Sequence, residues 1–173
     1  MKVIILDIDG VLNSNKWYGE KITLDLLEAE GDACEFDPEA VSILNRITDT
    51  TGAKIIVSSS WRNGNTEYLR KLFKEVGIKG EVLSETKNFH LLYNELPFFL
   101  PRGLEIKEHL SSVYGFPKYD WDIADPKTEI ETYVILDDDA DMLYEQRNNF
   151  IQTTWADGLT DELADKAIAI LLK

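Results

Sequence analysis

The amino-acid sequence predicts an α/β protein, a three-layer sandwich in which helices cover both faces of a central parallel sheet. The first observation is an apolar run at residues 3–6, typical of a strand that is buried on both faces. The second is the alternation of such runs with segments of helical periodicity. The third is the lack of an internal repeat or linker, so we expect one domain over residues 1–173.

Strands and helices are expected to alternate along the chain. The expected strands cover residues 3–6, 54–57, 81–84, 133–136 and 150–154. The expected helices cover residues 38–50, 66–76, 102–114, 140–149 and 161–172. Asp37 followed by Pro38 is typical of a helix start, because Asp caps free amides and Pro fits the first turn. Alternation of this kind favours parallel strands joined by right-handed crossovers.

Residues 14–36 interrupt this pattern directly after the first strand. They include Trp17, Tyr18 and a stretch with helical spacing at residues 22–30. We expect a small flap or cap insert with a short helix beside the end of the first strand. The alternative is a surface excursion whose aromatic side chains pack onto the body of the protein.

Composition restricts the class of protein. Apolar residues make up 44% of the chain, which is typical of a globular protein. Cys34 is the single cysteine, so no intramolecular disulfide can form, as in proteins of a reducing compartment. No signal peptide and no run long enough to cross a membrane is evident. We therefore expect a cytoplasmic protein that makes no membrane contact.

The charge balance restricts the partners. The chain has 18 Lys and Arg residues against 32 Asp and Glu residues, a formal charge of −14. A field of this sign repels phosphate backbones and anionic membranes at long range, so we expect no nonspecific nucleic-acid binding. A divalent cation and a few basic side chains can still hold a single phosphate group.

Polar residues follow three of the apolar strands. Asp7 and Asp9 follow the first, residues 58–60 (SSS) follow the second, and Asp137 and Asp138 follow the fourth. Carboxyl ends of parallel strands meet at one edge of a sheet, so these side chains should converge. Carboxylates with hydroxyls favour a hard ion such as Mg²⁺. Turn formation at Asp7 and helix capping after Asp137 are the plain alternatives.

The motifs together resemble the haloacid dehalogenase (HAD) superfamily of phosphotransferases over residues 1 to about 155. Residues 7–11 (DIDGV) resemble its first motif, and Asp137 with Asp138 resembles its fourth, with Asp141 as a candidate to assist. The resemblance implies a Rossmann-like sandwich. It also implies a nucleophile at Asp7 and a general acid and base at Asp9.

Two further motifs leave alternatives open. The second motif is a hydroxyl residue after the second strand, for which Ser59 is favoured, Ser58 is the reserve and Ser60 also qualifies. The third is a basic residue near a helix start, for which Arg102 fits and Lys107 is second. The resemblance implies that Ser59 and Arg102 bind phosphoryl oxygens.

A phosphatase with an aspartyl-phosphate intermediate follows from the resemblance. Mg²⁺ would be held by Asp7, Asp137, Asp138 and the backbone carbonyl of Asp9. A phosphoacceptor signalling domain and a catalytically silent HAD-like binding module are the alternatives. The first of these normally carries its acceptor on a middle strand, and no Asp follows residues 54–57.

The stretches SSSWR, RGLEI and ILDDD look closest to the HAD branch associated with nucleic-acid end repair. The substrate would then be a small phosphorylated molecule or a nucleic-acid end, with Arg62 contacting phosphate or forming a surface ion pair. His90 and His109 are not expected to act as ligands. Aromatic residues of the rim are expected to stack on a nucleobase, and they are Trp17, Tyr18, Trp61 and Phe98.

Overall fold

The computed structural model describes residues 1–24, 31–89, 100–116 and 129–173, arranged around a five-stranded sheet. All strand pairs are parallel, and their order is β3-β2-β1-β4-β5. The strands are β1 (Lys2–Leu6), β2 (Lys54–Val57), β3 (Val82–Glu85), β4 (Thr132–Asp137) and β5 (Phe150–Gln152). The predicted Rossmann-like parallel sheet is therefore confirmed.

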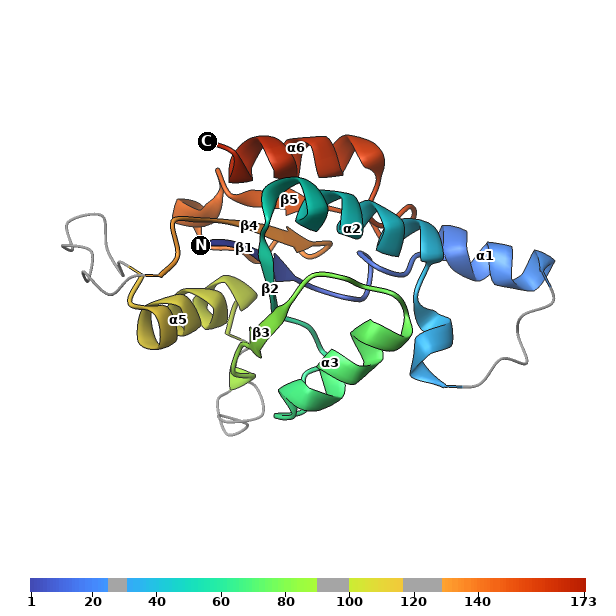
Figure 1. The fold of residues 1–173 in the computed structure, drawn as a ribbon, viewed down its shortest axis with the longest axis horizontal. Coiled ribbons are helices and arrows are strands. Elements are labelled where there is room, and N and C mark those ends of the chain that lie inside the picture. The colour runs from blue at the N-terminus through green and yellow to red at the C-terminus, as the bar shows by residue number, and fades with distance from the viewer. Residues whose placement is uncertain (25–30, 90–99, 117–128) are drawn as a thin grey trace.

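A helix or a 3₁₀ turn follows each strand along the chain (Figure 1). The helices are α1 (Asn15–Thr23), α2 (Pro38–Thr51), α3 (Thr66–Glu75), α5 (Arg102–Tyr114) and α6 (Asp161–Leu171), with two 3₁₀ turns, η1 (Asp32–Glu35) and η2 (Tyr144–Gln146). Helix α2 shows why the boundaries fall where they do. The Asp37 carboxylate accepts a hydrogen bond from the Glu39 amide, and Gly52 ends the helix at φ 68°.

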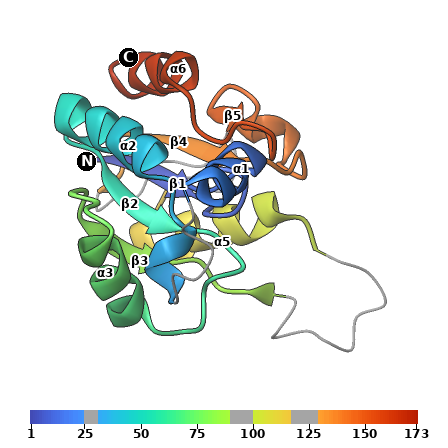
Figure 2. The same cartoon turned by 90° about the vertical axis from the view of Figure 1, so that its right-hand side faces the viewer.

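Side chains of β1 alternate between two cores on opposite faces of the sheet. Ile4 and Leu6 belong to the larger core, which includes residues of α2, α3 and α6. Val3 and Ile5 belong to the second core, which includes Ile106 of α5. Helices thus cover both faces of the sheet, which confirms the predicted three-layer sandwich (Figures 1 and 2).

The helix predicted at residues 140–149 is wrong. This segment turns through η2 instead, because its polar side chains bond to the start of α5. The Asp141 carboxylate accepts a hydrogen bond from the Arg102 amide at 2.7 Å, and the Gln146 side chain donates to the Gly103 carbonyl at 2.9 Å. Hydrogen bonds of this kind compete with a helix for the same groups.

The segment predicted as a flap, residues 14–36, contains α1 and η1. Helix α1 begins earlier than the predicted helical stretch, because the Ser14 hydroxyl caps the Trp17 amide. Most of the predicted stretch at residues 22–30, and residues 90–99 and 117–128 on either side of α5, lie outside the described residues. None of the described helices has the length and apolarity needed to cross a membrane.

The strand register brings the site together. Leu6 of β1 pairs with Val57 of β2 on one side and with Leu136 of β4 on the other. The residues that follow these three, Asp7, Ser58 and Asp137, therefore lie side by side at the carboxyl edge of the sheet. Figure 2 views the molecule from this edge, with α1 in front of it and pointing towards the viewer.

Candidate active site

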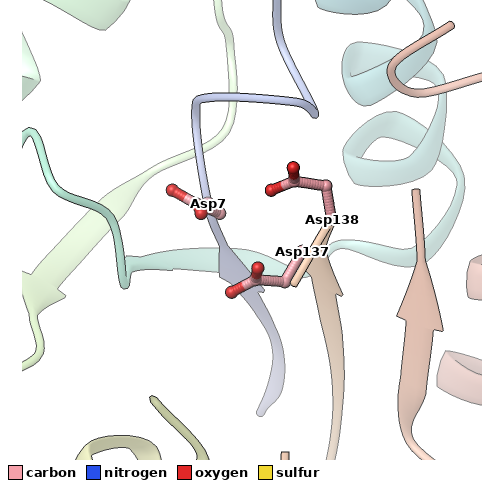
Figure 3. Close-up of side chains that lie close together, drawn as sticks. All are labelled: Asp7, Asp137 and Asp138. Carbon is pink, nitrogen blue, oxygen red and sulfur yellow. The ribbon is translucent and has the colours of Figure 1, made fainter. Parts of the chain in front are cut away.

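Three carboxylates converge at the centre of this edge. Asp7 follows β1, Asp137 is the last residue of β4, and Asp138 comes next (Figure 3). Each contributes an oxygen that lies within 4.8 Å of those of the other two. Asp7 and Asp137 are buried and Asp138 is half-buried. The cluster therefore places three like charges together, largely shielded from water.

The environment of the cluster raises the pKa values of its acids. Burial raises the pKa of Asp7 to about 6, although the Arg102 charge and the Ser59 hydrogen bond act in the opposite direction. Burial, followed by the Asp7 charge, raises the pKa of Asp137 to about 8. Neighbouring buried carboxylates resist joint ionisation unless a cation compensates their charge.

The donor set fits a hard divalent cation. One oxygen of Asp137, Oδ1, accepts a hydrogen bond from the Asp139 amide at 3.0 Å. The other, Oδ2, is buried and has no hydrogen-bond partner among the described residues. Mg²⁺ takes oxygen ligands of this kind, so Asp7, Asp137 and Asp138 could hold it between them.

Gly10 makes the close approach between the turn after β1 and Asp138 possible. Its φ is +67°, and a Cβ atom at this position would lie 2.4 Å from Cγ of Asp138. The Gly10 amide donates to the Asn13 side chain, and its carbonyl accepts from the Thr153 hydroxyl at 2.7 Å. Any side chain here would displace Asp138 from the cluster.

Asp9 lies in a different environment, although it stands only two residues from Asp7. Its carboxylate accepts hydrogen bonds at 3.0 Å from the Asn13 side-chain Nδ2, the Ser60 hydroxyl and the Trp61 indole. Sequence reasoning missed Asn13 and Trp61 as partners, since no local pattern pairs them with Asp9. The contribution of the Asp9 backbone carbonyl to a metal site stays a prediction.

The three serines after β2 face different partners. Ser59 is fully buried and its hydroxyl bonds to Asp7, lowering the pKa of that acid. The Ser58 hydroxyl accepts a hydrogen bond from Thr86 at 3.1 Å, and Ser60 bonds to Asp9. Of the three candidates, Ser59 is therefore the one that reaches the acid cluster.

Arg102 is the basic residue of the cluster. It is the first residue of α5, and its charge acts against the raised pKa values of Asp7 and Asp137. Its Nη1 is buried and has no hydrogen-bond partner in the described part of the chain. Lys107, the second candidate, pairs instead with Glu145 at 2.5 Å. The Arg102 guanidinium can therefore donate to an anion bound beside Asp7.

Arg62 forms a buried ion pair with Glu105, where the sequence left a phosphate contact and a surface ion pair open. Its Nη1 lies 2.9 Å from Glu105, and the two side chains are 4% and 6% exposed. Its Nε donates to the Ser59 carbonyl, and Nη1 also bonds to the Thr86 hydroxyl. Glu105 was missed in the sequence, although it stands three residues after Arg102 on the same helix.

The aromatic residues predicted for the rim differ in their exposure. Trp17 is buried, and Trp61 packs against Phe36 with ring centroids 5.6 Å apart. Tyr18 is half-buried and lies beside Trp155, which sequence reasoning did not single out. Phe98 lies outside the described residues, as does His90. His109 is buried and bonds to the Ser84 hydroxyl at 2.9 Å.

The parallel sheet and its edge of buried acids define a domain of the HAD class. Residues 3–164 match the family model described as the HAD domain in Swiss Army Knife RNA repair proteins, so the chain belongs to this family. The predicted superfamily and its nucleic-acid repair branch are confirmed. Membership supports phosphatase-type chemistry in an RNA repair context. Comparisons with curated proteins and with solved structures gave no match.

Proposed function

We propose that the protein is a Mg²⁺-dependent phosphatase that removes a phosphate group from a nucleotide or a nucleic-acid end through an aspartyl-phosphate at Asp7. One observation carries the proposal. The carboxylates of Asp7, Asp137 and Asp138 converge within 4.8 Å, beside an Arg102 whose Nη1 lacks a partner among the described residues. Acids for a cation and a guanidinium for an anion thus occupy one site.

The first chemical step forms a bond between a carboxylate oxygen of Asp7 and phosphorus while the bond to the leaving oxygen breaks. Asp9 donates a proton to that oxygen, which leaves as an alcohol. Ser59 and Arg102 donate hydrogen bonds to the phosphoryl oxygens. Bound Mg²⁺, held by the three clustered acids and the Asp9 carbonyl, would neutralise charge on the phosphoryl group and Asp7.

The second step returns the protein to its starting state. Asp9, now ionised, accepts a proton from water as the water oxygen attacks phosphorus. The bond to Asp7 breaks, and inorganic phosphate leaves. The Asn13, Ser60 and Trp61 donors orient the Asp9 carboxylate between these transfers.

The family context supports a nucleic-acid end as the substrate. The segment at residues 14–36 is short for a cap, so we propose an open site within a single domain. An open site admits the end of a strand, whereas a net charge of −14 disfavours contact along a long polyanion. A nucleotide or a short oligonucleotide end satisfies both conditions.

A substrate panel tests the proposal. Phosphate release is measured with and without Mg²⁺ from oligoribonucleotides phosphorylated at the 5′ or the 3′ end, a nucleoside monophosphate and a sugar phosphate. We expect Mg²⁺-dependent release, abolished in Asp7→Asn and retained in the surface control Asp49→Asn. If folded wild-type protein releases no phosphate from any ester with Mg²⁺, the proposal fails in favour of a silent binding module.

A further inference from the structure

An aromatic pair lies at the carboxyl edge of the sheet, outside the acid cluster but close enough to Asp9 for the charge of Asp9 to act on one of its members. The pair consists of Tyr18 on α1 and Trp155 in the loop between β5 and α6. Their ring centroids are 6.5 Å apart and the rings are tilted by 43°. Trp155 is 41% exposed, so part of its indole remains open to a ligand.

The loop that carries Trp155 is attached to both acid-bearing segments. The Thr153 amide donates to the Asp137 carbonyl at 2.9 Å, and the Thr153 hydroxyl donates to the Gly10 carbonyl at 2.7 Å. The Trp155 carbonyl in turn accepts a hydrogen bond from the Asn15 amide at 2.8 Å. Thr153, two residues before Trp155, therefore anchors this loop to the turn that follows Asp7.

Tyr18 is held from the other side. Its hydroxyl bonds to Glu35, and Lys21 lies 4.6 Å from the centre of its ring while pairing with Glu35 at 3.1 Å. Burial, followed by the hydrogen bond to Glu35 and the charges of Glu35 and Asp9, raises the pKa of Tyr18 to about 12, so the phenol stays neutral. The ring is thus fixed before any ligand arrives, which lowers the cost of binding.

We propose that Tyr18 and Trp155 form a stacking subsite for the base of the nucleotide whose phosphate is bound at Asp7. This inference rests on the proposed function, and it explains how the site selects nucleotide ends over esters that lack a base. Bases stack on aromatic faces whatever their sequence, so this subsite would accept an end nucleotide with any base. A single aromatic pair is also far smaller than a stable protein–protein interface.

The first test compares phosphate esters that carry a base with one that lacks it. Adenosine monophosphates with the phosphate on the 5′ or 3′ oxygen are compared with ribose 5-phosphate. For Trp155→Ala we expect kcat/KM for the adenosine esters to fall about 5- to 20-fold, mainly through KM. The kcat/KM of Trp155→Ala for ribose 5-phosphate should equal that of the wild type. Trp155→Phe should retain most of the preference for the adenosine esters.

Tyr144→Ala is the matched control, because Tyr144 is 80% exposed on η2, where it stacks with Arg147. Tyr144→Ala should change kcat/KM for neither the adenosine esters nor ribose 5-phosphate. An equal loss for both esters in Trp155→Ala would show a structural role for the indole. No loss for the adenosine esters would place the base elsewhere. Either result overturns the subsite.

A binding measurement separates this inference from the proposed function. Calorimetry with Asp7→Asn and Mg²⁺ should give a lower Kd for adenosine monophosphate than for ribose 5-phosphate. The difference should disappear when Trp155→Ala is added. If the wild type shows no turnover, the proposed phosphatase function alone is contradicted. Equal Kd values for the two esters would contradict the stacking subsite alone.

Discussion

Asp7 is the residue on which the proposed chemistry depends. Replacing it by Asn keeps its shape but removes the nucleophile and one buried charge. We expect Asp7→Asn to fold with an unchanged or higher Tm, since its burial opposes ionisation. Its kcat should fall on the order of 10⁴-fold or more, as for other covalent nucleophiles. Turnover near that of Asp49→Asn, which removes a surface carboxylate, would exclude Asp7 from the reaction.

The buried His109 should make the stability of the protein depend on pH, independently of the active site. Burial, followed by the charges of Lys87 and Arg62, lowers the pKa of His109 from 6.5 to about 4. The native state therefore favours the neutral imidazole, and the stability that this contributes is present above pH 6.5 and is lost as pH falls towards 4.

The expected loss attributable to His109 is about 2 kcal/mol at pH 4.5. It is measured as the change, between pH 7.5 and pH 4.5, in the difference between the free energies of unfolding of the wild type and His109→Gln. The other acids titrate in both proteins, so their contribution cancels. A difference that does not change with pH would mean that the imidazole is not held neutral.

At the scale of elements, the Arg62–Glu105 pair joins the loop after β2 to α5. It connects the two segments that carry Ser59 and Arg102, with Nη1 of Arg62 2.9 Å from Glu105. Removing one partner leaves the other charge buried, which costs about 3–5 kcal/mol. We expect a loss of this size in the free energy of unfolding of Arg62→Met, measured by urea denaturation.

Arg46→Met provides the matched control for that experiment. Arg46 pairs with Asp165 at 2.6 Å and with Asp161 at 3.0 Å on the surface, where its side chain is 39% exposed. Water screens the charges of these exposed pairs, so Arg46→Met should lose far less stability than Arg62→Met. Equal small losses in Arg46→Met and Arg62→Met would contradict a structural role for the buried pair.

The convergence of Asp7 with Asp137 could be predicted because it depends on strand order and parallel pairing alone. The partners of Asp9 could not, because Ser60 and Trp61 reach it only through the path of the loop after β2. The predicted helix at residues 140–149 failed for a similar reason. The polar side chains of this segment bond to α5, which is distant in sequence, so local periodicity could not indicate these hydrogen bonds.

At the scale of the whole molecule, the site concentrates negative charge in a protein whose formal charge is −14. The raised pKa values of Asp7 and Asp137 favour their protonated forms in the metal-free native state. Their stabilising effect is present below pH 4 and is lost as pH rises through about 6 and then about 8. Mg²⁺ should offset this loss, because it binds the ionised carboxylates.

We therefore expect Mg²⁺ to raise the Tm, and to raise it more at pH 8 than at pH 6. Asp138→Ala removes one acid of the cluster and should abolish most of the shift. Asp139→Ala removes the same charge from the next residue, which is exposed and outside the cluster, and should retain the shift. The same Mg²⁺-induced shift in calorimetric scans of both variants would place the ion elsewhere.

The most direct test of the account is to trap the phosphoryl group on the protein. Protein turning over a phosphate-labelled nucleotide with Mg²⁺ is quenched in acid, digested and mapped by mass spectrometry. We predict a label on Asp7 that hydroxylamine removes, as expected of an acyl phosphate, and that Asp7→Asn lacks. Phosphate release without any labelled protein, or a label on another residue, would contradict nucleophilic attack by Asp7.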